Sequence, residues 1–232
     1  MSYNYSDSLF SFYNDISVNR YPEFTDYLKE TKIEIINDFI GNENNIKLFY
    51  ESFVYRDNYK VFLCGINPGI RGAGQTGIPF MDFNTLGKIF STQGIRNNLQ
   101  GYEGSANYFQ TIVKEIGYER FYNTFYVTNI SCIGFYCIGN KGRKVNMNYY
   151  ILPVKLQHIL YLSLLKEIEL LKPELIIPLS EEVEITLKNI REDFRLSFEI
   201  EQRLKHPNFC NMRSKNFAVW KQEYISLLQK YL

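Results

Sequence analysis

The chain has 232 residues, of which 45% are apolar, 22% charged and 16% aromatic. This length and apolar content are typical of one compact domain and exclude a disordered or collagen-like chain. No apolar stretch approaches the ~18 residues that cross a bilayer, and the N-terminus lacks a basic n-region and an apolar core. We therefore expect a cytoplasmic protein with no membrane partner.

The net charge is only +1, which excludes a strongly basic nucleic-acid coat protein. This balance hides an asymmetry along the chain. Residues 1–58 carry a net charge of −5, whereas residues 201–232 carry +4. Residues 137–158 carry four basic side chains and no acidic one. The two basic segments could converge on one face of the fold.

Cysteine and histidine usage gives little support to a metal site. Cys64, Cys132, Cys137 and Cys210 contain no C-x-x-C pair, and only two histidines are present. We therefore expect no metal and no cofactor, and we expect the cysteines to be small buried apolar residues.

Hydrophobic periodicity predicts the first elements of the fold. Residues 21–40 form an amphipathic pattern that predicts a helix, with Gly41 as its stop. The apolar run over residues 60–66 predicts a strand buried on both faces, and a glycine-rich loop over residues 67–79 follows it.

The remaining pattern alternates helices with strands. The expected elements, in chain order, are helices over residues 83–90 and 106–116, a strand over 124–129, a Gly- and Lys-rich loop to 148, a helix over 153–171, a strand over 175–179, a helix capped by Ser180, a strand over 195–204 and a helix over 214–231.

This alternation predicts a single α/β domain. We expect a three-layer α/β/α sandwich with a central four-stranded, mainly parallel sheet. In such sheets the functional site lies outside the carboxyl ends of the strands. Here those ends are the loops that begin at Asn67, Asn129, Ser180 and His206.

One motif near-match points to a different function. The segment from Gly69 to Thr76 nearly fits the phosphate-binding pattern G-x-x-x-x-G-K-[ST]. However, Gln75 stands where the lysine should be, and Pro79 soon breaks the helix that must open there to face a phosphate. Nucleotide hydrolysis is therefore the last of the alternatives.

The same residues resemble the first motif of the uracil-DNA glycosylase superfamily, closest to its single-strand-selective monofunctional (SMUG-type) branch. The family's G-M-N-P-G-P and G-M-A-Q-T-G-V-P-F are matched without a gap by residues 65–70 and 72–80. Residues 127–133 are similar to the family's H-N-x-C-P-L, and residues 139–144 are similar to its G-x-S-G-R-N. Residues 206–215 are similar to its last motif, H-P-S-P-R followed by N-P-Q-A-N-K.

The resemblance covers about residues 61–221 and leaves the N-terminal helical part, residues 1–58, without a motif. It implies a monofunctional DNA repair enzyme that hydrolyses the N-glycosidic bond of uracil, or of a 5-modified uracil, and leaves an abasic site. Cleavage places positive charge on the sugar and negative charge on the base, so the site must hold a water molecule and stabilise an anion.

The resemblance also implies a role for each matched residue. Asn67 would hold the water, and His206 would donate a hydrogen bond to the uracil O2, for which a neutral imidazole suffices. Asn129 would read the uracil edge and reject cytosine, while Phe80 would stack on the extruded base. Gly69 and Gln75 complete the implied substrate-binding set.

DNA contacts are implied for two loops, with these residues: Gly142, Arg143, Lys144, Pro207, Asn208, Phe209, Arg213 and Lys215. Here the chain departs from the family, because Cys210 stands at the place of the arginine that wedges into DNA. Arg213 or Phe209 could replace it. We expect a monomer that binds uracil-containing single- or double-stranded DNA through a basic active-site face, with modest, salt-sensitive affinity.

Two rival functions stay open at this point. One is a glycosylase of the same fold for another base, such as hypoxanthine, xanthine or 5-hydroxymethyluracil. The other is a non-catalytic relative that only binds nucleic acid.

Overall fold

The structure is a computed structural model that describes residues 5–53, 59–90, 102–212 and 214–232. Its centre is a four-stranded sheet in the order β3-β2-β6-β7, in which every neighbouring pair is parallel. The strands are β2 (Val61–Gly65), β3 (Phe125–Asn129), β6 (Leu175–Pro178) and β7 (Glu199–Ile200). All residues of β2 and β3 are buried, as expected of strands covered on both faces.

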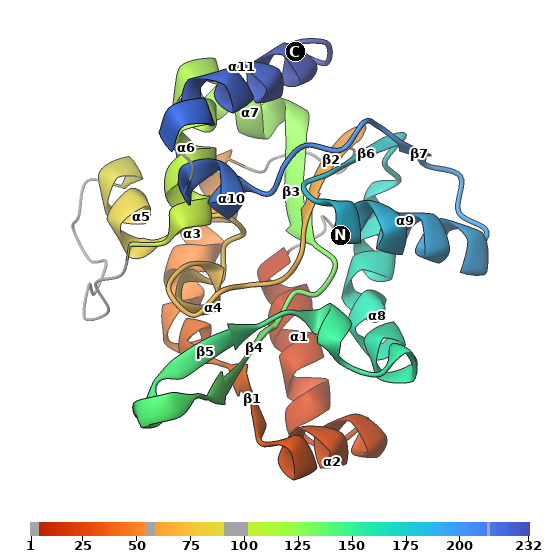
Figure 1. The fold of residues 1–232 in the computed structure, drawn as a ribbon. Helices are drawn as coiled ribbons and strands as arrows, with labels where there is room; N and C mark the ends of the chain where they lie inside the picture. The colour runs from red at the N-terminus through yellow and green to blue at the C-terminus, as the bar shows by residue number, and fades with distance from the viewer. Residues whose placement is uncertain (1–4, 54–58, 91–101, 213) are drawn as a thin grey trace.

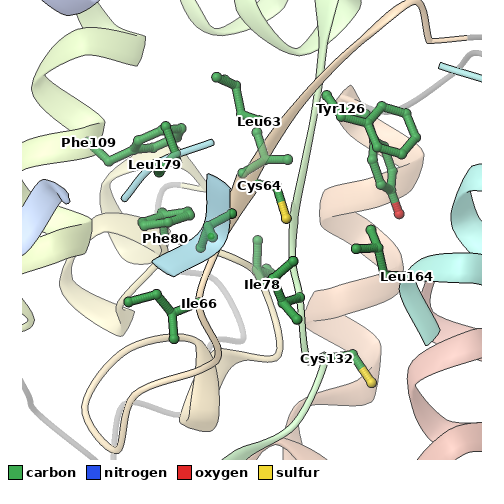
Figure 2. Close-up of a cluster of buried hydrophobic side chains, with 14 of the residues drawn as sticks. Leu63, Cys64, Ile66, Ile78, Phe80, Phe109, Tyr126, Cys132, Leu164 and Leu179 are labelled. Atoms are coloured by element: carbon green, nitrogen blue, oxygen red, sulfur yellow. The ribbon is translucent and has the colours of Figure 1, made fainter. Parts of the chain in front are cut away.

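Helices flank this sheet (Figure 1). Figure 2 shows Phe109 of α6 (Gly104–Ile116) on one side of β2 and Leu164 of α8 (Val154–Leu171) on the other. The predicted α/β/α sandwich with a four-stranded parallel sheet is therefore confirmed. One hydrophobic cluster runs from Leu9 to Leu228, so the N-terminal helices share their core with the rest of the described chain.

A second sheet, which sequence analysis missed, lies beyond the carboxyl ends of β2 and β3 (Figure 1). It is antiparallel, in the order β1-β4-β5, and consists of β1 (Ile33–Ile36), β4 (Gly134–Ile138) and β5 (Lys144–Met147). The Gly- and Lys-rich stretch predicted as a loop therefore contains a β-hairpin.

The helix predicted over residues 21–40 is wrong in its second half. The helix observed there, α2 (Pro22–Thr31), ends where Lys32 adopts a left-handed conformation, with φ 55°. The isoleucines that follow pair with β4 as a strand. β-Branched residues suit a strand, and periodicity alone does not separate a short apolar strand from a helix turn.

The other helices are, in chain order, α1 (Tyr5–Ser17), α3 (Glu43–Phe53), α4 (Ala73–Thr76), α5 (Phe83–Ile89), α7 (Tyr118–Thr124), α9 (Glu181–Asp193), α10 (Pro207–Met212) and α11 (Phe217–Leu228), with 3-10 turns η1 (Asp38–Asn42), η2 (Asn140–Gly142), η3 (Tyr149–Ile151) and η4 (Ser214–Asn216). Of these helices, α5, α9 and α11 lie where a helix was predicted, α1 and α3 lie in the N-terminal part expected to be helical, and α4, α7 and α10 were not predicted. Ser180 caps α9 as predicted, because its Oγ accepts the Val183 N–H at 3.2 Å.

Two smaller expectations need correction. The fourth strand shrinks to two residues, because Leu196 N–H still donates to the Arg191 carbonyl at the end of α9. Cys64, Cys132 and Cys210 are buried as expected, but Cys137 is half-buried. In the described part of the chain, no helix is both long enough and apolar enough to cross a membrane.

Candidate active site

A pocket of about 400 Å³ opens at the carboxyl edge of the parallel sheet. The strands of that sheet contribute to its wall through their carboxyl ends or the segments that follow them, as expected for an open α/β sheet. Six residues that the sequence singled out line it together: Asn67, Gly69, Phe80, Asn129, His206 and Asn208.

Asn67 follows β2, and hydrogen bonds fix its carboxamide. Its Nδ2 donates to the carbonyl oxygens of Pro68 at 3.1 Å and Met147 at 3.3 Å. Its Oδ1 accepts the backbone N–H of Tyr149 at 3.0 Å. A carbonyl oxygen has two lone pairs, so one lone pair of Oδ1 is left for a ligand or a water molecule.

His206 follows β7 and is held as a neutral imidazole. Its Nδ1 accepts the backbone N–H of Asn208 at 3.2 Å, which leaves the ring proton on Nε2. Burial lowers the pKa of His206 from 6.5 to about 4, although the nearby carboxylate of Glu182 acts in the opposite direction. At neutral pH the imidazole is therefore an uncharged hydrogen-bond donor.

Phe80 forms the aromatic wall of the pocket in a strained conformation. Its φ is 54°, which is rare for a large side chain. Stacking on Phe109, with ring centroids 4.7 Å apart, and a 3.1 Å hydrogen bond from Gln110 Nε2 to its carbonyl hold it there. Backbone strain of this kind clusters at functional sites.

Gly65 makes room for the pocket at the end of β2. A Cβ on this residue would lie 2.5 Å from Cζ of Phe80 and closer still to Oδ1 of Asn129. The absent side chain therefore lets the phenyl ring and the amide approach each other.

Asn129 lines the pocket at the end of β3 and is buried, with 5% of its surface exposed. Among the residues that the structure describes, no partner hydrogen-bonds its side-chain amide. A buried amide normally finds partners, so this one is available to a ligand.

Several predicted residues lie outside the pocket lining. Gln75 is buried on α4, and its Oε1 has no hydrogen-bond partner within the described residues. Gly142 lies in the exposed turn between β4 and β5, with φ 70°. Pro207 is buried at the start of α10, and Lys215 is exposed on η4. Arg213 lies outside the described residues.

Cys210, which stands at the place of the family's wedging arginine, faces the core as expected of a buried cysteine. Residues 207–212 form the helix α10, and positions 207 and 210, three apart, share its buried face. Cys210 is fully buried, and burial raises the pKa of its thiol to about 11. Phe209 is 40% exposed, but its ring packs on Trp220, with the two ring centroids 5.2 Å apart. Met212 is 74% exposed at the end of the helix.

A second depression adjoins the pocket. It is a groove of about 760 Å³ that shares Glu103, Asn146 and Asn208 with the pocket wall. Arg143 and Lys144 line it as basic residues, together with Arg71, which sequence analysis did not select. Lys144 also lies over the Tyr136 ring, with Nζ 4.2 Å from its centroid.

Four other basic residues of the two positive segments are ion-paired. Lys155 pairs with Glu23 of the acidic N-terminal part, Lys205 with Glu223 and Lys221 with Glu115. Arg203 pairs with Glu184. The free positive charge beside the pocket therefore comes from fewer residues than the segment totals suggest.

Six polar residues in the pocket wall were not predicted from the motifs. They are Glu103, Ser105, Asn146, Asn148, Tyr150 and Glu182. Glu103 caps α6, since its Oε2 accepts the Ala106 N–H at 2.7 Å, and burial raises the pKa of its carboxyl group. The absence of a side chain at Gly72 gives this carboxylate room. No sequence motif marks these residues, because the fold brings them to the pocket from other segments.

Fold and site together define a three-layer α/β protein whose pocket combines one aromatic wall with several hydrogen-bonding side chains. The chain matches the family model for the uracil DNA glycosylase superfamily over residues 53–229, which is most of its length. It therefore belongs to the uracil-DNA glycosylase superfamily.

Solved structures give a similar result. The chain resembles the wild-type SMUG2 of Pedobacter heparinus with a TM-score of 0.73 and 25% sequence identity, over 85% of this chain and 88% of that one. The search of curated proteins found no match.

Proposed function

We propose that this protein is a monofunctional DNA glycosylase that hydrolyses the N-glycosidic bond of uracil in DNA and leaves an abasic site. One observation carries the proposal. In a single pocket, Asn67 offers only an acceptor, His206 offers only a donor, and the buried amide of Asn129 has no partner among the described residues.

The pocket would bind the base after it leaves the helical stack. The ring of Phe80 offers a face on which a planar base stacks. The amide of Asn129 would donate to O4 of uracil and accept from N3–H. Cytosine presents the opposite pattern at this edge, so the same orientation would leave polar groups unpaired.

Bond cleavage would then use the two fixed hydrogen-bonding groups. As the bond breaks, negative charge develops on the base, and the Nε2–H of His206 would stabilise it at O2. Because the imidazole is already neutral, it does not have to give up its proton. The free lone pair of Asn67 Oδ1 would accept a hydrogen bond from the water that attacks the electron-poor sugar carbon.

Water attack also agrees with the composition of the pocket wall. Among the described residues that line the pocket there is no lysine. An imine with the sugar needs such an amine nucleophile, so we propose that no lyase step follows.

DNA would follow the groove beside the pocket. Arg71, Arg143 and Lys144 would contact phosphates there. Met212 lines the same groove and is 74% exposed. We propose that its flexible side chain, rather than Cys210 or Phe209, fills the space left by the extruded base.

The experiment that tests this function incubates the protein with oligonucleotides that carry one U, 5-hydroxymethyl-U, hypoxanthine, xanthine or T. Single- and double-stranded forms are compared, and abasic sites are scored by alkaline cleavage. We expect release of uracil. Release of another base alone would support a same-fold glycosylase of different specificity, and DNA binding without any release would support a non-catalytic relative.

Two variants test the residue roles. Asn67→Ala and His206→Ala should each remove most of the turnover and keep the affinity for DNA, because both side chains act on the reacting atoms. Unchanged rates in these variants would contradict both assignments.

A further inference from the structure

The second sheet, whose strands were not predicted from the sequence, contacts the proposed water-holding residue directly. Met147 is the last residue of β5, and Tyr149 begins the η3 turn that follows. The carbonyl of Met147 accepts from Asn67 Nδ2, and the N–H of Tyr149 donates to Asn67 Oδ1. Both contacts use backbone atoms, so they depend on the path of the chain.

The geometry resembles the pairing of two strands. Asn148, between the two contact residues, is extended, with φ −96° and ψ 148°. In extended chain, the C=O of one residue and the N–H of the residue two positions on point to the same side. The carboxamide of Asn67 therefore pairs with residues 147–149 as a peptide group of a neighbouring strand would.

This pairing admits only one orientation of the amide. Rotated by 180°, the Asn67 oxygen would face the two carbonyl oxygens of Pro68 and Met147, and its NH₂ group would face the Tyr149 N–H. In the observed orientation both amide N–H groups are used, so the side chain acts toward the pocket solely as an acceptor.

Several contacts fix the position of this backbone segment. In register across the sheet, Ile35 of β1 faces Phe135 of β4, which faces Met147 of β5. The buried Tyr149 is hydrogen-bonded through its hydroxyl to Thr186 Oγ1 of α9 at 2.6 Å. The Oδ1 of Asn146 accepts the Ile70 N–H at 2.8 Å and so ties the loop after Asn67 to β5.

We propose that the β1-β4-β5 sheet, with residues 146–149, is a positioning element that orients the Asn67 carboxamide, and that this makes an amide, rather than a carboxylate, necessary at position 67. The inference rests on the proposed function, in which Asn67 holds the attacking water. It gives the N-terminal part a role in catalysis, because β1 lies outside residues 53–229, which match the family.

The first test replaces Asn67 by Asp in the full chain. An ionised carboxylate would face the carbonyls of Pro68 and Met147, so its pKa would be raised above the usual ~3.9 of Asp, and at pH 8 the charged side chain would turn away. Protonated, the carboxyl group can donate to one carbonyl and accept from Tyr149. Single-turnover release of uracil by N67D should be at least 100-fold slower than wild type at pH 8 and should rise at least tenfold on going to pH 6.

The pH profile of the wild-type protein is the control. It contains the effect of every other titratable group that lines the pocket, because both proteins carry Glu103, Tyr150, Glu182 and His206. A wild-type rate for N67D, or a rate that does not rise as the pH falls, would overturn the positioning proposal. The Asn67→Ala variant separates the two proposals. If N67A is slow and N67D is fast, only the positioning proposal fails; if N67A is as fast as wild type, the proposed function fails first.

The second test perturbs the element and leaves Asn67 intact. Asn146→Ala removes the tie to Ile70, and the exposed Asn140 in the turn of the same hairpin offers the matched control Asn140→Ala. We expect N146A to lower kcat at least tenfold with KM within twofold of wild type, because a misplacement of about 1 Å is enough for such a loss. N140A should match wild type. A change confined to KM in N146A, or equal effects in both variants, would overturn the proposal.

Discussion

Replacement of Gly65 by Ala is the sharpest perturbation of the proposed base pocket. The new methyl group would lie 2.5 Å from Cζ of Phe80 and closer still to Oδ1 of Asn129. Carbon atoms pack at about 3.5–4.0 Å, so at least one of these groups must move by about 1 Å. Phe80 is held by Phe109 and Gln110, so the displacement is resisted at the residues proposed to stack on and read the base.

The magnitude follows from this clash. Overpacking of this kind costs about 1–3 kcal/mol of unfolding free energy. At about 2–4 °C per kcal/mol for a chain of this size, the melting temperature should fall by about 2–12 °C. A misplacement of about 1 Å in a catalytic site can cost about 100-fold in rate, so we expect a loss of that order in single-turnover release of uracil.

The assay compares Gly65→Ala with Gly41→Ala at a temperature where both variants are folded. Gly41 is a suitable control, because nothing in the described structure lies within 4 Å of its added Cβ. G41A should keep the wild-type rate. A wild-type rate for a folded G65A would refute the assignment of the pocket to the base.

Three further predictions concern His206, the basic groove and the exposed methionine. The pKa of His206 is about 4 in the folded chain, against an ordinary value of 6.5. Between these two pH values the unfolded chain binds a proton that the folded chain does not bind. The free energy of unfolding should therefore fall by up to about 3 kcal/mol as the pH drops from 6.5 to 4. Chemical denaturation at pH 7 and 4.5 should show a smaller loss in His206→Asn, and equal losses would contradict the buried neutral imidazole. Arg143→Glu and Lys144→Glu should each weaken DNA binding and make the affinity less dependent on salt concentration. The control Lys155→Glu, at an ion pair with Glu23, should change neither. The same dependence of affinity on salt in all three variants would contradict a DNA path in the groove. Met212→Ala should slow release of uracil from duplex DNA at least tenfold more than from single-stranded DNA. The reason is that unstacking costs a few kcal/mol per base step only in the duplex. The control Phe209→Ala should not show this difference between the two substrates. An equal loss on both substrates would argue against Met212 as the wedge.

The local sequence predicted those parts of the fold in which one segment determines its own structure. The buried run at residues 60–66 and the Ser180 cap are such cases, and both elements form where expected. Strand β1 and the hairpin β4–β5 could not be predicted in this way. These three strands are short and mixed in polarity. β1 becomes a strand by pairing with β4, about a hundred positions away in sequence, and β5 completes the sheet by pairing with β4 in a local hairpin.

The residues of the candidate site also fall into two groups, those that a local motif predicted and those that only tertiary packing brings to the pocket. Asn67, Asn129 and His206 lie at or after the carboxyl ends of parallel strands, so sheet topology brings them together. Phe80 joins them because its ring packs beside Gly65 at the end of β2. Glu103 and Tyr150 reach the pocket from segments without a motif, and only tertiary packing places them there. The burial of Cys210 was expected, but the matched motif did not reveal that residues 207–212 form a helix that turns this position toward the core.

The central claim is that this pocket hydrolyses uracil from DNA, and the most direct test measures both products of a single turnover. Wild-type protein is incubated with an oligonucleotide that carries one uracil, free uracil is quantified by mass spectrometry, and the strand is examined before and after alkali. We predict one free uracil per strand and a backbone that breaks only after alkali, with neither product in Asn67→Ala. No free uracil from wild type on either single- or double-stranded DNA would contradict the account, and strand cleavage before alkali would contradict its monofunctional chemistry.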